Sequence, residues 1–199
     1  MKAIAKIISY IFHPLLIPTY VLCVMIQLNP YYFYTIEAKK AIAIVAYSTF
    51  FFPIIALLLM KKLDFVDSLE LPDKQQRIIP MIIAIVCFVW TFLSVKKTGF
   101  PQAYTWFLLG ATISLFIAFF INVFHKLSLH ITAMSGGLMA ILMMFFYAQL
   151  DANYYFIGAI IALGAVASSR LFLNAHTPKE INTGFIVGLI GQIIAVNFF

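Results

Sequence analysis

Residues 169–180 read SRLFLNAHTPKE and lie between two strongly apolar runs near the C-terminus. This stretch brings together Arg170, His176 and Glu180 in a chain of which only 10% of residues are charged. Ionisable groups are energetically unfavourable beside lipid, so such a cluster at a membrane boundary indicates a functional site. A cation, a histidine and a carboxylate in this order suit a site in which the carboxylate orients the histidine as a nucleophile or a base.

The composition around this stretch is typical of a multi-pass membrane protein. The 199 residues are 64% hydrophobic and include 21 phenylalanines, whereas soluble domains are closer to half apolar. The apolar runs are long and mostly free of charge, which favours helices over the short alternating strands of a barrel. We therefore predict an all-α membrane protein, a bundle of six to seven transmembrane helices. Residues 1–199 are expected to form one domain, with a catalytic core at about 63–199 and accessory helices in 1–62.

Seven apolar runs are each close to the ~20 residues that a bilayer-spanning helix needs. They cover about 5–28, 41–60, 78–95, 103–124, 131–150, 154–169 and 181–199. Pro14 and Pro18 interrupt the first run, and they either kink one span or divide it into an interfacial helix and a short span. Glycines gather in the last three runs, which predicts close packing of these helices.

Three polar segments follow the second, fourth and sixth runs, at residues 63–77, 125–130 and 170–180. An even number of crossings separates each segment from the others, so we expect all three on the same side of the membrane. Together they hold three of the four histidines, and their cations include Lys74, Arg77, Lys126 and Arg170. The count predicts that the three segments converge on one site.

The convergent set suits a phosphate ester or a diphosphate. Cations stabilise the charge on the equatorial oxygens during phosphoryl transfer. A histidine can attack phosphorus while a carboxylate holds its other ring nitrogen, and a second histidine can protonate the leaving oxygen. His176 and His130 are the candidates for these roles.

Residues 177–180 also read as a helix start. Thr177 is predicted as the N-cap and Pro178 as the first helical residue. His176 would then lie just before a helix N-terminus, where free backbone N–H groups favour anions. Thr177 and Glu180 equally form a capping box, which requires no catalysis.

These residues resemble the type 2 phosphatidic acid phosphatase superfamily, whose fold is shared with the vanadium haloperoxidases. The third signature of that family is Ser-Arg, five residues, His, three residues, Asp, and later Gly. Ser169-Arg170, His176, Glu180 and Gly184 match its spacing, with a carboxylate one methylene longer. The motif is fairly specific because the spacing and four residue types coincide.

The other two signatures are altered. The second, Pro-Ser-Gly-His, is LSLH at residues 127–130, which keeps Ser128 and His130. The first, Lys, six residues, Arg-Pro, keeps Lys74, Arg77 and Pro80 with only two residues between each pair. Lys74 and Arg77, three residues apart, would still share one face of a helix.

The resemblance implies a bundle like the phosphatase and haloperoxidase core, and a reaction without metal or cofactor. His176 would be the nucleophile that forms a phosphohistidine, Glu180 its orienting carboxylate and His130 the general acid. The phosphoryl oxygens would be bound by Lys74, Arg77, Ser128 and Arg170. Lys126 lies outside the family pattern and is either an accessory phosphate contact or an interfacial lysine.

The leading hypothesis is a membrane phosphatase that hydrolyses a lipid phosphate or diphosphate. One alternative is an intramembrane zinc-dependent hydrolase that uses His125, His130, His176 and Glu180. Another is a non-catalytic lipid-binding or transport protein of the same fold. The expected partners are the bilayer and the lipid substrate, with neither nucleic acid nor an obligate protein partner.

The expected location is the inner (plasma) membrane of a bacterium, and the side of the site stays open. Of the 13 Lys and Arg residues, nine fall on the side of the polar segments and four on the other. The positive-inside rule would assign the larger number to the cytoplasm. Four of the nine have an alternative role in binding phosphate, and without them the difference almost disappears.

Overall fold

The computed structural model describes residues 2–33, 37–71, 73–147, 149 and 151–198 of the protein. These residues form helices, turns and connecting segments, and no strand occurs among them. The elements in chain order are α1 (Lys2–Ile11), η1 (Pro14–Leu16), α2 (Ile17–Leu28), η2 (Pro30–Phe33), α3 (Ala38–Ala46), η3 (Tyr47–Phe51), α4 (Phe52–Lys62), α5 (Ile78–Lys97), α6 (Gln102–Phe124), α7 (Leu129–Tyr147), α8 (Asn153–Phe172) and α9 (Pro178–Asn197).

Seven helical segments of the described chain are long and apolar enough to cross a membrane. They are Lys2–Leu28, Ala38–Lys62, Ile78–Lys97, Gln102–Phe124, Leu129–Phe146, Asn153–Phe172 and Pro178–Asn197. The protein is therefore an all-helical, multi-pass membrane protein, as the sequence predicts. The segments agree with the predicted runs to within a few residues, but the predicted ends at Leu150 and Phe199 lie outside the described residues.

The sixth predicted run ended at about Ser169, and α8 continues to Phe172 and carries Arg170 in its last turn. The helix ends where its last carbonyls accept backbone bonds in a C-terminal cap made by the following residues. Arg170 therefore projects from a helix rather than from a loop.

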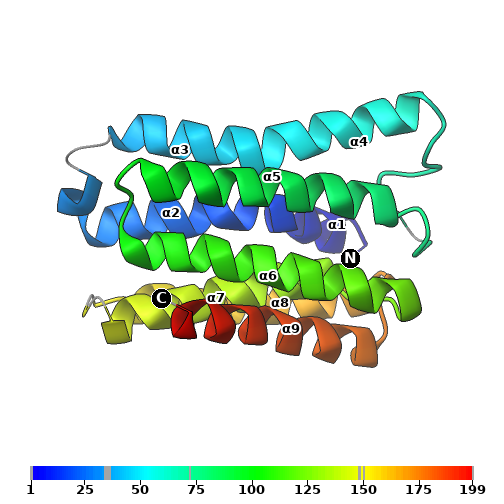
Figure 1. Ribbon diagram of the computed structural model, residues 1–199. Coiled ribbons are helices and arrows are strands. Elements are labelled where there is room, and N and C mark those ends of the chain that lie inside the picture. The colour runs from blue at the N-terminus through cyan, green and yellow to red at the C-terminus, as the bar shows by residue number, and fades with distance from the viewer. Residues whose placement is uncertain (1, 34–36, 72, 148, 150, 199) are drawn as a thin grey trace.

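The seven spanning segments run side by side along a common direction, so each connection between them lies at one of two ends of the bundle (Figure 1). The connections α4–α5, α6–α7 and α8–α9 lie together at the right-hand end of the view, close to the N-terminus. The C-terminus lies toward the opposite end. The prediction that the three polar segments share one side is confirmed.

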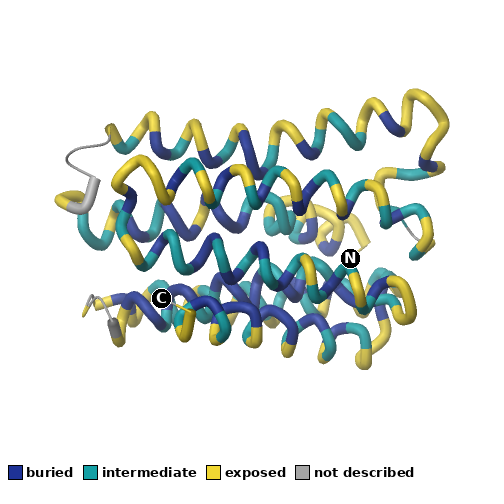
Figure 2. The backbone as a smooth tube through the Cα atoms, viewed as in Figure 1, coloured by how far each residue is buried: buried dark blue, intermediate teal, exposed yellow. Residues whose placement is uncertain are grey.

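Apolar side chains cover much of the outer surface of the bundle. Trp90 on α5 is 70% exposed and Phe120 on α6 is 63% exposed, although both are large and apolar. Figure 2 shows exposed positions on the outer turns of α3 and α4 and buried positions where helices face one another. Such a surface suits the hydrocarbon core of a bilayer, whereas a soluble protein rarely exposes apolar patches of this extent.

Helix α9 packs closely against α6 and α7 at glycines. A Cβ atom built on Gly184 would lie 2.6 Å from the carbonyl oxygen of Ser128, and one built on Gly191 would lie 2.6 Å from that of Gly110. Small residues of this kind let membrane helices approach at backbone distance. The glycines of α8 differ from the prediction, because Gly158 and Gly164 have no such neighbour within 4 Å.

The first span is broken after Ile11, and α1 and α2 are separate helices joined through His13 and Pro14. Pro14 has no N–H to continue the ladder, so the break leaves backbone carbonyls without helical partners. Within a membrane such groups must be satisfied internally. Side chains of the bundle do so: His130 at Ser9 O, Tyr20 at Ile11 O and Thr49 at Leu15 O. Tyr104 also donates to Pro18 O in the first turn of α2.

Candidate functional site

The loop between α8 and α9 holds the most specific sequence motif. Helix α8 ends in a Schellman cap, in which the N–H of Ala175 donates to the carbonyl of Arg170 and that of Asn174 to Leu171. Asn174 takes the left-handed conformation that this cap requires, with φ of 52°. The next two residues lead directly into α9, so this loop leaves His176 little freedom of position.

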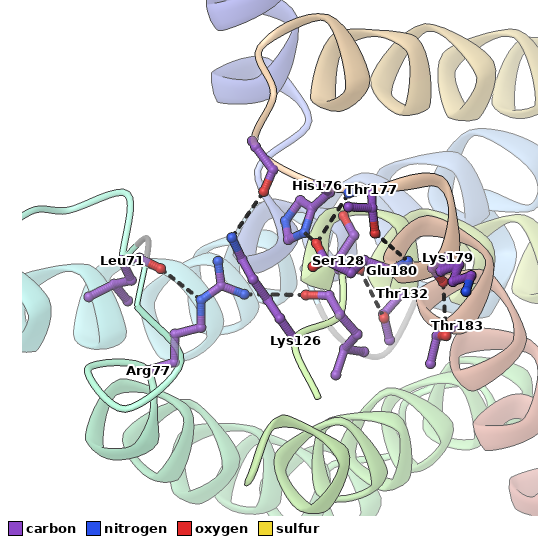
Figure 3. Close-up of polar contacts among 12 residues, drawn as sticks. Leu71, Arg77, Lys126, Ser128, Thr132, His176, Thr177, Lys179, Glu180 and Thr183 are labelled. Carbon is purple, nitrogen blue, oxygen red and sulfur yellow. Dashed lines mark hydrogen bonds and ion pairs between the residues drawn. The ribbon is translucent and has the colours of Figure 1, made fainter. Parts of the chain in front are cut away.

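His176 and Glu180 form a direct pair. The His176 Nδ1 atom lies 2.7 Å from Glu180 Oε2, and the His176 side chain is only 2% exposed. The same carboxylate oxygen accepts the N–H of Thr177 at 3.3 Å, while Thr177 Oγ1 accepts the N–H of Glu180 at 3.4 Å. The predicted capping box is confirmed, and Glu180 both caps α9 and holds the imidazole (Figure 3).

The second polar segment is bonded to this helix start. The backbone N–H of Ser128 donates to the carbonyl of Glu180 at 3.2 Å, and Gly184 leaves room for the Ser128 carbonyl beside α9. The segment at residues 127–130 therefore meets the start of α9 at backbone level. This contact positions the start of α7, and with it His130, relative to His176.

Two cations lie beside the pair and are held by backbone carbonyls (Figure 3). Arg77, which is 6% exposed, donates from Nε to Leu71 O at 2.7 Å and from Nη1 to Leu127 O at 3.2 Å. Lys126 Nζ donates to Ala175 O at 3.1 Å. Each of these contacts joins two of the three polar segments or braces one of them, and neutral carbonyls leave the positive charge of each side chain uncompensated.

A cavity of about 620 Å³ opens among these residues. Its lining includes the cations Lys2, Lys6, Arg77, Lys126 and Arg170, and Glu70 is the single acidic residue among the described residues that line it. His13, His130 and His176 line the same cavity. Deeper along the helices the walls are mostly apolar. They include Met81, Ala84, Phe88, Phe107 and Leu115, with Ser114, Thr132 and Gln192 as polar members. One end of the cavity attracts anions, and the other suits hydrocarbon.

The electrostatic surroundings keep His176 neutral at pH 7. Burial lowers the pKa of His176, the hydrogen bond that His176 donates to Glu180 opposes this shift, and the nearby charges of Arg170, Arg77 and Lys126 lower the pKa further. A neutral imidazole that bonds a carboxylate through Nδ1–H has its lone pair on Nε2. Nε2 is thus the nitrogen available for nucleophilic attack.

Burial and neighbouring cations also lower the pKa values of Arg77 and Lys126, the two basic residues beside His176. The pKa of Arg77 is lowered by burial and by Arg170, against the attraction of Glu180 and Asp73. Burial and Arg77 likewise lower the pKa of Lys126, against the attraction of Glu180. An anion bound among these groups would relieve the repulsion between them, which is a reason for the cavity to bind one.

Two of the predicted phosphate ligands carry buried polar atoms that no described residue bonds, Arg170 Nε and Ser128 Oγ. Buried polar groups nearly always have partners, so an unpaired donor indicates a site for a ligand or for water. Arg170 lines the cavity, whereas Ser128 is fully buried behind it. Arg170 is therefore the stronger candidate for a direct contact with an anion.

The structure brings together most of the predicted site residues, but Lys74 lies apart. Its Nζ donates to the carbonyls of Val123 and Phe124 at the end of α6, at 3.3 and 3.1 Å. It does not line the cavity. A cation at a helix C-terminus complements the partial negative charge of the terminal carbonyls, so Lys74 has a structural explanation of its own.

The four residues of the zinc alternative are dispersed. His176 is paired with Glu180, His130 Nε2 faces the Ser9 carbonyl at 3.1 Å, and His125 is exposed at the end of α6. In the part of the chain that the structure describes, no three His, Cys, Asp or Glu side chains are close enough to hold a metal ion.

Residues of the first span line the cavity, although sequence reasoning did not include them in the site. His13 has no counterpart in the three signatures described above. The pattern His13-Pro14 was the available signal, because a proline in an apolar run breaks the helix and frees polar groups.

No protein-family model, curated protein or solved structure matches the chain. The resemblance to the phosphatase superfamily rests on the residues and spacings of the polar segments alone.

Proposed function

We propose that the protein is a metal-independent membrane phosphatase that hydrolyses a lipid phosphate or diphosphate through a phosphohistidine. The observation that carries this proposal is the His176–Glu180 pair, with Nδ1 and Oε2 2.7 Å apart, in a cavity lined by Lys and Arg. A carboxylate-held neutral imidazole beside several cations suits nucleophilic attack on an anionic phosphoryl group.

In the proposed reaction, His176 Nε2 forms a bond to phosphorus as the bond from phosphorus to the leaving oxygen breaks. Doubly protonated His130 gives the proton on Nδ1 to that oxygen, which belongs to a lipid alcohol or a lipid phosphate. Water then attacks the phosphohistidine and gives a proton to His130 as the N–P bond breaks, so inorganic phosphate leaves with His176 and His130 restored. Arg77, Lys126 and Arg170 stabilise the charge on the phosphoryl oxygens.

The apolar depth of the cavity favours a lipid over a water-soluble phosphate. Along α5, the 11 steps from Arg77 to Phe88 correspond to about 16 Å at 1.5 Å per residue. This is roughly half of the ~30 Å hydrocarbon core. One apolar chain of the substrate would occupy this part of the cavity while its phosphate meets the cations.

The proposal includes the plasma membrane of a bacterium as the location, because helical bundles are the form that inner-membrane proteins take and barrels are found in the outer membrane. The few residues outside the helices leave little surface for reading a large headgroup. A lipid with a small phosphate or diphosphate headgroup is the favoured substrate class.

The test is phosphate release by the purified protein in detergent micelles or liposomes, against a panel of lipid phosphates and diphosphates. His176→Ala should abolish release, and His125→Ala, at an exposed histidine outside the cavity, should leave it unchanged. Turnover by His176→Ala at the wild-type rate contradicts the proposal. Lipid binding without turnover on any member of the panel favours the non-catalytic alternative.

A further inference from the structure

The break in the first span contributes directly to the cavity that holds His176. Helix α1 ends at Ile11, and the carbonyl of Ser9 in its last turn faces His130 Nε2 at 3.1 Å. A carbonyl oxygen only accepts hydrogen bonds, so Nε2 of His130 carries a proton. The other nitrogen, Nδ1, is the one that can give or take a proton in the cavity.

His13 has the opposite arrangement. It is the N-cap of η1, and its Nδ1 accepts the backbone N–H of Leu15 at 3.4 Å. An accepting Nδ1 carries no proton, so the proton of the neutral ring is on Nε2. The local turn therefore presents His13 to the cavity as a neutral N–H donor.

The two histidines lie together in the same cavity. Their ring centroids are 5.7 Å apart with an edge-on orientation, and both line the cavity together with Arg170 and His176. Protonation of His13 would put a second hydrogen where the Leu15 N–H already points and would add charge near Arg170. His13 is thereby suited to donate a hydrogen bond while it remains neutral.

We propose that His13 is a further catalytic residue, which donates a hydrogen bond from Nε2–H to the leaving oxygen beside the general acid His130. No proton is transferred from His13: the hydrogen bond stabilises the charge that develops as the P–O bond breaks. Ser9 acts through His130 and is a positioning residue. This inference rests on the proposed phosphatase function and adds the broken first span to its site.

A matched pair of substitutions separates the two nitrogens of His13. His13→Asn places an oxygen near the position of Nδ1, keeps an N-cap for η1 and removes the donor at Nε2. His13→Gln places an amide nitrogen near the position of Nε2 and keeps the donor. Both lack the ring, so lost ring packing against Phe50 and His130 affects both variants alike.

The experiment measures kcat of each variant on a lipid phosphate and on 4-nitrophenyl phosphate, whose leaving group needs little assistance. His13→Asn should lose about 100-fold on the lipid phosphate, the usual cost of one preorganised donor, and much less on 4-nitrophenyl phosphate. His13→Gln should recover most of the lipid activity. Unfolding temperatures of the two variants in detergent show whether the N-cap is kept.

Wild-type kcat in His13→Asn overturns the proposal, as do equal losses in the two variants or equal losses on the two substrates. A wild-type protein without phosphatase activity refutes the proposed function, and this inference with it. Activity that requires His176 but is indifferent to His13 overturns only the inference.

Discussion

Replacement of Glu180 by glutamine removes one negative charge from the site and little else. The amide oxygen of glutamine can still accept hydrogen bonds from His176 Nδ1–H and from the N–H of Thr177, as the carboxylate does at 2.7 and 3.3 Å. The tautomer of His176 and the cap of α9 should therefore persist. The substitution isolates the contribution of the charge to catalysis.

The magnitude follows from the changing charge of His176. Its ring is neutral before the reaction and becomes positive as the N–P bond forms, so the carboxylate stabilises the transition state more than the ground state. Hydrogen bonds to charged groups contribute about 1.5–3 kcal/mol and neutral ones about 0.5–1.5 kcal/mol, so loss of the charge alone costs about 1–1.5 kcal/mol. At about 1.36 kcal/mol for each factor of ten, kcat should fall by about 5- to 13-fold, with little change in KM.

The assay is phosphate release from a lipid phosphate as a function of pH, with Thr177→Ala as the control. Burial and nearby cations lower the pKa of His176, so the acid limb of kcat/KM should lie below the ordinary value of 6.5. The bond to Glu180 raises the pKa of His176, so Glu180→Gln should move this limb to still lower pH.

Thr177→Ala removes the bond from Thr177 Oγ1 to the N–H of Glu180 but leaves the carboxylate. Loss of an N-cap costs about 1 kcal/mol of stability, and kcat should not change. The reasoning is refuted if Glu180→Gln retains wild-type kcat and the same acid limb while its unfolding temperature drops as in Thr177→Ala. Glu180 would then be a helix cap alone.

Two further substitution pairs test the packing and the cation assignments. Gly184→Ala introduces a Cβ atom 2.6 Å from a backbone carbonyl and should destabilise the protein by about 1–3 kcal/mol, measured by thermal unfolding in detergent. Gly164→Ala meets nothing within 4 Å and should be neutral or stabilising, so equal losses would contradict the packing. Lys126→Met removes a cation from the cavity lining and should lower kcat/KM for a lipid phosphate well below that of Lys74→Met, whose lysine bonds α6 carbonyls outside the cavity. A lower kcat/KM for Lys74→Met than for Lys126→Met would instead support Lys74 as the phosphate ligand.

Local signals in the sequence were sufficient for the spans and for the centre of the site. A spanning helix is set by the length and apolar character of one run, so the spans from the second onward could be counted directly. An even number of crossings separates the three polar segments, so the sequence also predicted that they lie on the same side. The cap at Thr177 and the double role of Glu180 also followed from residues within one helical turn, because caps and i, i+4 pairs are local.

The directions of the side chains at the end of the bundle with the polar segments could not be predicted from local sequence. Lys74 has the residue type and spacing of a phosphate ligand, but the neighbouring end of α6 offers carbonyls that take its ammonium group. The sequence does not specify which helix ends are adjacent, nor how each helix is rotated, because close contacts such as that of Gly184 with Ser128 set both.

The first span shows most clearly which features the sequence predicts and which only the tertiary structure determines. Pro14 in an apolar run predicts a break from sequence alone, because proline cannot donate to the helical ladder. Only the tertiary structure determined which groups satisfy the freed carbonyls, and the packing of α7 against the break places His130 at Ser9. The same packing brings His13 into the cavity with His176, because a bilayer interior offers no water to solvate the broken backbone and neighbouring polar side chains must do so.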